Sequence, residues 1–195
     1  MPYKLIVLAL LLSSCVKKQE LPILSYYIDD SGKMVSYTFS GFEFTDQNNR
    51  KFISKDIKNK VSIANFFFTR CPSICPKMRN ELIKIAKEFE NDNDFTILSF
   101  TIDPKNDSTS ILKIYSENTQ ISATKWYFLR GEDAQLNHMT KLLRTSFKNQ
   151  DKNTDFYHSS YVALIDKNQQ IRGYYDLLDS KSVTHLLKDA KTLLK

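Results

Sequence analysis

The sequence predicts one α/β domain built on a mixed, mainly parallel β-sheet with helices packed against it. Residues 61–68 and 95–102 are almost entirely apolar, which is typical of strands buried on both faces of a sheet. A segment with apolar residues at helical spacing follows each of these strands, and strands that alternate with helices pair in parallel through crossover connections. Two strand-like runs then follow one another near the carboxyl end, which makes the predicted sheet mixed.

The expected elements begin with a hairpin inside residues 35–57. There Phe42 and Phe44 alternate with polar residues, and the turn-forming run 46–49 separates them from a second apolar run at 52–53. The expected elements after this hairpin are strands at 61–68, 95–102, 125–129, 160–166 and 171–175, and helices at 78–90, 108–118 (capped by Asp107 or Ser108), 132–147 and 181–194.

Composition excludes several classes of protein. Hydrophobic residues make up 42% and charged residues 26%, so the chain is neither disordered, collagen-like nor a multi-span membrane protein. It contains no GxGxxG and no GxxxxGK[ST] motif, so nucleotide binding has no motif support. The formal net charge is +6, but lysines and arginines are spread along the chain. We therefore expect no nucleic-acid partner, while a basic face toward anionic lipid or an acidic protein stays open.

The amino terminus is typical of an export signal. Lys4 precedes an apolar run at 5–12, which is much shorter than the roughly 20 residues that span a bilayer. The following Leu12-Ser13-Ser14-Cys15 resembles a bacterial lipoprotein signal, although Gly or Ala is more usual than Ser directly before the cysteine.

These features predict three segments. Residues 1–14 are the expected signal peptide, 15–34 the lipidated Cys15 and a polar tether, and 35–195 the folded domain. The alternative is an ordinary secretory signal with an incidental cysteine, which the lack of an A-x-A cleavage pattern disfavours. The expected location is a membrane surface outside the cytoplasm, on the periplasmic side, with inner and outer membrane both open.

The two remaining cysteines, Cys71 and Cys75, mark the expected site. They follow a buried strand directly and precede a helix, at the strand edge where open α/β sheets bind ligands. Pro72 favours an extended Cys71, and Pro76 suits a first helical turn, which places Cys75 at the helix start. We expect the positive end of the helix to favour the Cys75 thiolate.

The C-x-x-x-C spacing is one residue longer than the C-x-x-C of thioredoxin-type redox sites. Two thiolates so placed can share a soft metal ion such as Cu(I) or Zn(II), or close a disulfide. A metal needs a third ligand, and the chain has three histidines. His138 and His185 lie in predicted helices beside apolar stripes and are expected at the surface. His158 lies in a loop that leads into a strand, where it can face the cysteines or simply solvent.

A resemblance narrows these options. It is carried by residues 65–78 with the run FTRCPSICP, residues 99–104 with the run TIDP, Asp107, and His158-Ser159. In these residues the chain resembles the Sco/SenC family of copper chaperones for cytochrome c oxidase, and the resemblance extends over about residues 41–194. The resemblance implies a thioredoxin-like fold with an amino-terminal β-hairpin extension. It implies one copper ion, as Cu(I) or Cu(II), bound by Cys71, Cys75 and His158. Asp103 would then tune the site from behind the ligands, or merely cap the strand end before Pro104.

The chain departs from the family pattern at Tyr157. Many members carry Asp directly before the ligand histidine, whereas the nearest acid here is Asp155, a change that bears on the orientation of His158 and on partner recognition. No proline lies near His158, unlike the cis-proline of thioredoxin-type reductases, which favours metal binding over general dithiol exchange.

The resemblance implies a metallochaperone, not an enzyme, that delivers copper to, or matures the copper centre of, a respiratory oxidase or a related copper enzyme. The first alternative is a membrane-tethered thiol–disulfide reductase with Cys71 and Cys75 as its redox-active pair. The second is a binding module in which the two cysteines form a passive staple, although so short a loop stabilises little.

Overall fold

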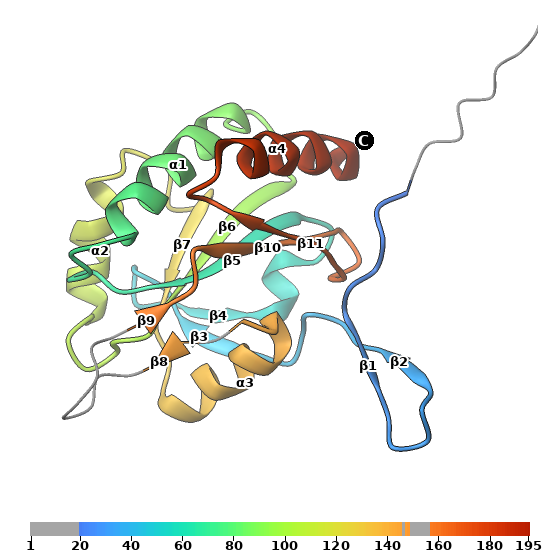
Figure 1. The fold of residues 1–195 in the computed structure, drawn as a ribbon. Helices are drawn as coiled ribbons and strands as arrows, with labels where there is room; N and C mark the ends of the chain where they lie inside the picture. Colours follow the sequence, from blue (N-terminus) through green and yellow to red (C-terminus); the bar gives the residue numbers. More distant parts are fainter. Residues whose placement is uncertain (1–19, 146, 149–156) are drawn as a thin grey trace, which may run out of the picture.

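The fold is organised around a five-stranded sheet (Figure 1). The computed structural model describes residues 20–145, 147–148 and 157–195. The strands, in order across the sheet, are β11 (Ile171–Asp176), β10 (Tyr161–Ile165), β5 (Val61–Phe67), β6 (Phe95–Thr101) and β7 (Trp126–Leu129). Strands β5, β6 and β7 run parallel, β10 is antiparallel to β5, and β11 is antiparallel to β10. The mixed, mainly parallel sheet expected from the sequence is confirmed.

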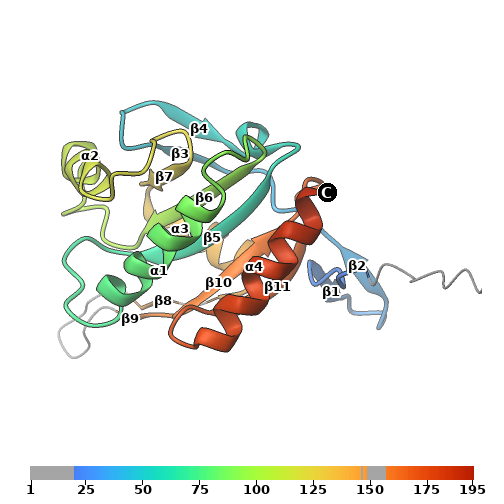
Figure 2. The same cartoon turned by 90° about the horizontal axis from the view of Figure 1, so that it is seen from above.

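Helices cover both faces of the sheet (Figures 1 and 2). Helices α1 (Cys75–Glu88) and α4 (Ser180–Leu194) lie side by side on one face, joined by an ion pair between Glu88 and Lys191. Helix α3 (Asp133–Leu143) lies on the opposite face, and α2 (Thr109–Glu117) packs against β7. Within the described ranges, no helix is long and apolar enough to cross a membrane.

Local signals explain where most helices begin. Pro76 lies in the first turn of α1, where its missing N–H costs no hydrogen bond. The Ser108 hydroxyl accepts the N–H of Ile111 and caps α2, so Ser108 and not Asp107 is the cap. The side chain of Asp179 accepts two N–H groups at the start of α4 in the same way.

Helix α3 is shorter than the helix expected at 132–147. It ends at Leu143, because Arg144 adopts a left-handed conformation with φ 50°. Phe147 belongs instead to β8 (Phe147–Lys148), which pairs antiparallel with β9 (Tyr157–His158). The expectation of helix through 147 was wrong, since pairing with a distant segment outweighs local helical spacing.

In the described part of the chain, two hairpins precede the central sheet. The expected one is formed by β3 (Glu43–Thr45) and β4 (Lys51–Ile53), followed by a 3₁₀ turn, η1 (Ser54–Ile57). The side chain of Gln47, in the hairpin turn, donates to the carbonyl of Trp126 and accepts the N–H of Phe128. The hairpin is thereby fastened to the backbone of edge strand β7.

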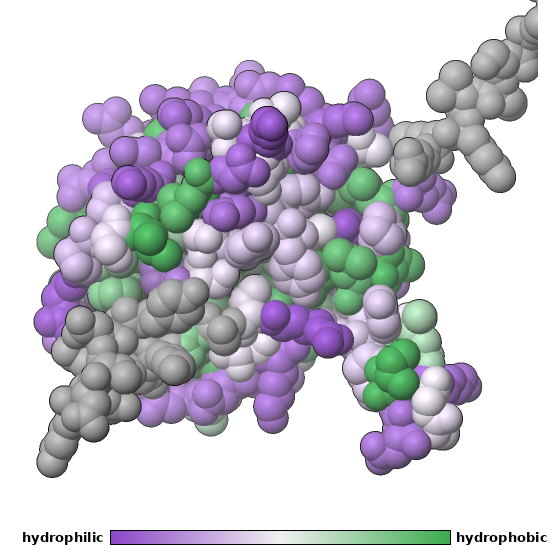
Figure 3. Space-filling model, in the orientation of Figure 1, coloured by the Kyte–Doolittle hydropathy of each residue, from purple (hydrophilic) through white to green (hydrophobic). Residues whose placement is uncertain are grey.

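The other hairpin, β1 (Tyr26–Ile28) with β2 (Met34–Ser36), begins within the segment expected to be a tether. The Asp29 carboxylate closes its turn by accepting the N–H groups of Ser31 and Lys33. This arm projects from the body of the protein (Figures 1 and 3). Its residues Ile28 and Met34 are more than half exposed. Cys15 lies outside the described residues, so the three-segment division stays a prediction.

A buried polar chain crosses the parallel strands and generates a stability prediction. Trp126 Nε1 donates to Ser99 Oγ at 2.9 Å, and Ser99 Oγ donates to Asn65 Oδ1 at 2.8 Å. We expect Ser99→Ala to lower the free energy of unfolding by about 1–3 kcal/mol, because it leaves a buried donor and a buried acceptor without their partner. Urea unfolding measures the change.

Ser62 is the matched control. It is as buried as Ser99 and lies on the neighbouring strand, but its hydroxyl has no hydrogen-bond partner among the described residues. Ser62→Ala should therefore leave the stability unchanged or raise it slightly. Equal losses in the two variants would contradict the importance of the polar chain.

Candidate metal centre

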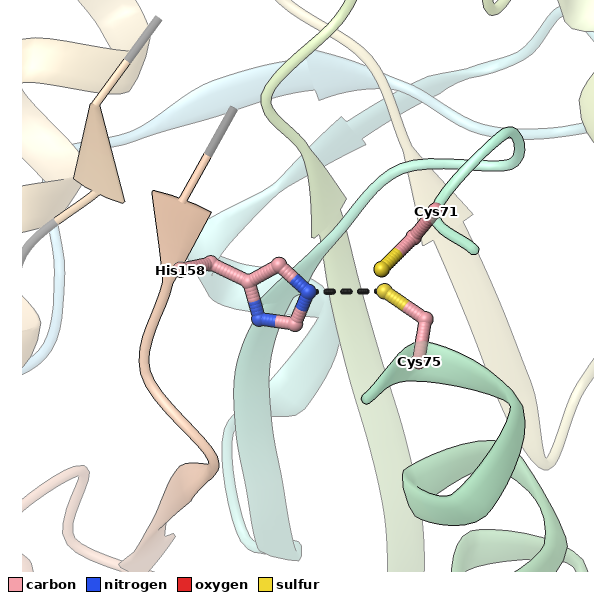
Figure 4. A group of neighbouring side chains, drawn as sticks. All are labelled: Cys71, Cys75 and His158. Carbon is pink, nitrogen blue, oxygen red and sulfur yellow. Dashed lines mark hydrogen bonds between the residues drawn. The ribbon is translucent and has the colours of Figure 1, made fainter. Parts of the chain in front are cut away.

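Cys71, Cys75 and His158 converge at the carboxyl end of β5 (Figure 4). Their ligand atoms all lie within 4.8 Å of one another, and all three residues are buried. The three come from different elements: Cys71 from the loop after β5, Cys75 from the first residue of α1, and His158 from β9. The structure thus brings together the three ligands that the resemblance implied.

The backbone places each ligand differently. Cys75 is fixed by α1, and His158 is fixed by β9, in which it pairs with Phe147 of β8. Cys71 precedes the helix and lies in a loop, where its own N–H donates to the carbonyl of Phe68. The two cysteines therefore do not share a helical turn, although their sulfur atoms still meet.

The hydrogen bonds of His158 define its tautomer. Its Nδ1 lies 3.0 Å from the carbonyl oxygen of Ser159, and a carbonyl can only accept, so Nδ1 carries the proton. Nε2 then presents its lone pair to Cys75 Sγ, 2.7 Å away. Burial lowers the pKa of His158 and favours this neutral form. A neutral imidazole whose far nitrogen is held by a carbonyl is the form that binds metals.

The two thiols differ in acidity, in the opposite order to that expected from the helix start. Burial raises the pKa of Cys75 well above its usual range, and the hydrogen bond to Cys71 adds to the shift. Burial also acts to raise the pKa of Cys71, but hydrogen bonds from the Cys75 thiol and from the N–H groups of Ser73 and Cys75 outweigh it, and its pKa is lowered. Desolvation therefore dominates over the helix end at Cys75, and Cys71 is the more acidic thiol.

Asp103 lies behind the cysteine loop without touching the ligands. Its carboxylate accepts hydrogen bonds from Arg70 and Asn106, both at 2.8 Å, and the carboxylate is almost fully buried. Its backbone carbonyl also closes the turn after β6 by accepting the N–H groups of Asn106 and Asp107. Asp103 therefore caps the strand end, as one expectation had it, and also holds Arg70, the residue next to Cys71. The other expectation, that it tunes the site, stays a prediction.

Asp107 is a buried carboxyl whose contacts sequence reasoning missed. It accepts the N–H of Thr69 at 3.1 Å, the hydroxyl of Thr69 at 2.5 Å and the hydroxyl of Thr101. Burial raises the pKa of this carboxyl, and the threonine hydrogen bonds oppose that shift. The available signal was its position just beyond the end of β6, beside the strand that leads to the cysteines.

The remaining expected residues lie away from the centre or outside the described ranges. His138 on α3 and His185 on α4 are exposed, as expected. Asp155 lies outside the described residues, so the consequence of Tyr157 in place of the usual Asp stays a prediction.

This donor set suits a soft metal ion. Two thiols and a neutral imidazole match the preferences of Cu(I) and Zn(II). Bonds of about 2.0–2.3 Å to one ion hold neighbouring ligand atoms farther apart than the 2.7 Å between Cys75 Sγ and His158 Nε2, so this pair would open slightly around a bound ion. Both cysteines are free, so the same pair can also form a disulfide.

Comparisons with known proteins agree with this fold and place the chain in a family. A sequence model of the SCO1/SenC family matches residues 32–195. The SCO2-like protein of Rickettsia typhi is 34% identical over 155 residues, which cover 76% of this chain and 75% of that protein. The structure of BsSco, a member of the Sco family of cytochrome c oxidase assembly proteins with an identified disulfide switch, matches with a TM-score of 0.72 at 23% identity, covering 91% of this chain and 99% of BsSco.

Yeast Sco1 with copper bound matches with a TM-score of 0.62 at 25% identity, covering 80% of this chain and 90% of the yeast chain. These likenesses confirm the thioredoxin-like fold with its amino-terminal hairpin. With the family model covering most of the chain, this protein belongs to the SCO1/SenC family.

Proposed function

We propose that this protein is a membrane-anchored copper-binding protein that delivers copper to, or matures the copper centre of, a respiratory oxidase. The observation that carries the proposal is the buried cluster of Cys71, Cys75 and His158, whose ligand atoms lie within 4.8 Å of one another with His158 Nε2 against Cys75 Sγ. Copper bound to yeast Sco1 and the oxidase-assembly role of the family of BsSco support the choice of metal and of recipient.

Copper is the cargo of this site. Cu(I) suits two thiolates and an imidazole, while Cu(II) would recruit a further ligand. Loading releases the thiol protons, so copper affinity rises with pH. Because Cys71 is the most exposed of the three ligands and the more acidic thiol, an incoming thiolate of the recipient displaces Cys71 first.

The order of thiol acidities also favours a second candidate function, a thiol–disulfide reductase. In that reaction the Cys71 thiolate attacks a partner disulfide and releases one partner thiolate. Cys75 then attacks the Cys71 sulfur, which releases the second partner thiolate and leaves a Cys71–Cys75 disulfide. Two electrons pass from the pair to the partner, and a cellular thiol reductant restores the pair. This function needs no metal and does not use His158 as a ligand.

Membrane attachment is part of the proposal and rests on the sequence. Cys15 follows a short apolar run and two serines, and acylation there would hold the domain at a membrane surface outside the cytoplasm. An anchored domain would stay close to a membrane-bound oxidase.

Copper titration tests the main proposal. The reduced full chain in detergent, titrated anaerobically with Cu(I), should bind one copper ion tightly. His158→Ala should weaken binding by more than about 10-fold, because even loss of a residue that only supports a ligand costs that much. His185→Ala, which removes an exposed histidine on α4, is the control and should bind as the parent does. Absence of tight copper binding, with a readily reducible disulfide, would favour the reductase.

The thiol order gives a second prediction. Because thiolate is the reactive form, alkylation of Cys71 by iodoacetamide should rise with pH at a lower pH than alkylation of Cys75. Peptide mass spectrometry after brief labelling of the metal-free reduced protein between pH 5 and 10 measures both rates. Faster labelling of Cys75 would contradict the assignment of Cys71 as the first thiol to exchange.

The anchor gives a third prediction. Cells that express the full chain should incorporate an alkyne-tagged fatty acid into the protein, and mature protein should begin at residue 15. Cys15→Ala should abolish the label, whereas Cys75→Ala should retain it. A labelled Cys15→Ala protein, or an unlabelled parent, would contradict lipidation at Cys15.

A further inference from the structure

The loop that carries Cys71 lies against the turn after β6. Strands β5 and β6 are parallel and in register to their ends, where Phe67 pairs with Thr101. The next residue, Ile102, continues the pairing by donating its N–H to the carbonyl of Phe67. Residues 102–107 therefore leave the sheet beside residues 68–71.

Two carboxylates of that turn hold the two residues before Cys71. Asp107 is fully buried and accepts both the N–H and the hydroxyl of Thr69, while Thr101 donates to it from the strand below. Asp103 accepts from the guanidinium of Arg70, which is largely exposed to solvent. The contact to Thr69 is the more buried of the two, and it fixes backbone as well as side chain.

The position of Cys71 depends on hydrogen bonds made by its loop more than the positions of Cys75 and His158 do. Cys75 is held within α1 and His158 within the β8–β9 pair, but Cys71 belongs to neither helix nor strand. Its sulfur must nevertheless reach the same point as theirs. Its position therefore depends on how the loop residues around it are held, and Thr69 is among them.

We propose that Asp107 is a positioning residue for Cys71: by holding Thr69 it sets where the Cys71 sulfur lies relative to Cys75 and His158. This inference deepens the proposed function and rests on it for the copper readout alone. Asp107 has no hydrogen bond to any of the three ligands. Its effect on Cys71 passes through the backbone of Thr69 and Arg70. The hydrogen bonds it accepts, not its charge, are what the site requires.

Three substitutions separate the hydrogen bonds of Asp107 from its charge. Asp107→Ala removes every hydrogen bond to Thr69 and Thr101. Asp107→Asn keeps the shape: its oxygen can accept the Thr69 N–H and the Thr101 hydroxyl, and its NH₂ can donate to the Thr69 hydroxyl, which serves equally as acceptor. Thr69→Val keeps the N–H bond, removes only the hydroxyl bond and preserves the side-chain volume, so it serves where Asp107→Ala fails to fold.

Asp166 provides a matched control. It is a buried aspartate that closes the turn between β10 and β11 by accepting the N–H groups of Asn168 and Gln170, and it also pairs with Arg172. It follows the end of β10, whereas His158 precedes the start of that strand.

Asp166→Ala should lower overall stability without changing the chemistry of Cys71 in the folded protein. It therefore measures what the loss of a buried turn carboxyl, together with its ion pair to Arg172, does to the protein when Thr69 stays held.

The experiment measures three properties of the full chain in detergent: anaerobic Cu(I) affinity, the pH profile of Cys71 alkylation, and the reduction potential of the Cys71–Cys75 disulfide. We expect Asp107→Ala to weaken Cu(I) binding at least about 10-fold, as for loss of a group that orients a ligand, and to shift the other two properties. Thr69→Val should show smaller changes of the same sign. Asp107→Asn should restore values within about 3-fold of the parent, in the range of a retained hydrogen bond.

The outcomes are distinct. Parent-like values in folded Asp107→Ala and Thr69→Val would overturn the positioning role, as would equal changes in Asp166→Ala. Failure of Asp107→Asn to restore function would overturn the claim that hydrogen bonds and not charge are required. If the parent itself binds no copper, the proposed function fails, while the alkylation profile and the potential still decide the role of Asp107.

Discussion

The parallel pairing of β5 with β6 is the constraint on which the site depends. The two strands stay in register to Phe67 and Thr101, so the chain leaves both at the same edge of the sheet. The cysteine loop emerges from one and the acidic turn from the other. Hydrogen bonds from Thr69 and Arg70 to that turn follow from this arrangement. A shift of register by one residue would exchange the side chains between the two covered faces of the sheet and would displace the loop from the turn.

Burial shapes the chemistry of the three ligands. A buried thiol or imidazole without a partner is costly, and here the groups partner one another: the single proton of the Cys75 thiol can be donated to His158 Nε2 or to the Cys71 sulfur. The same desolvation keeps His158 neutral and Cys75 protonated until a metal ion or a disulfide replaces the proton. The same two cysteines can therefore serve copper binding or dithiol chemistry. The two functions differ in His158, which only copper binding uses as a ligand.

Much of the fold could be predicted from periodicity. The apolar runs at 61–68 and 95–102 could hardly be anything but buried strands, and Pro76 and Ser108 carry helix-start signals that act within one turn. Local signals failed where distant segments decide the outcome. Residue Phe147 continues a helical pattern but pairs with His158, and the first hairpin lies in a stretch whose polar turn residues suggested a tether.

The sequence by itself determined which residues are candidates for the chemistry. The cysteine spacing and the adjacent prolines are local patterns, and the family resemblance rests on short motifs, so all of them can be recognised without a structure. Only the tertiary structure decided how those residues behave. The acidity of each thiol, the tautomer of His158 and the hydrogen bonds of Asp107 depend on burial and on groups that are distant in sequence. Desolvation and hydrogen bonding act through space, so a one-dimensional pattern carries little information about them.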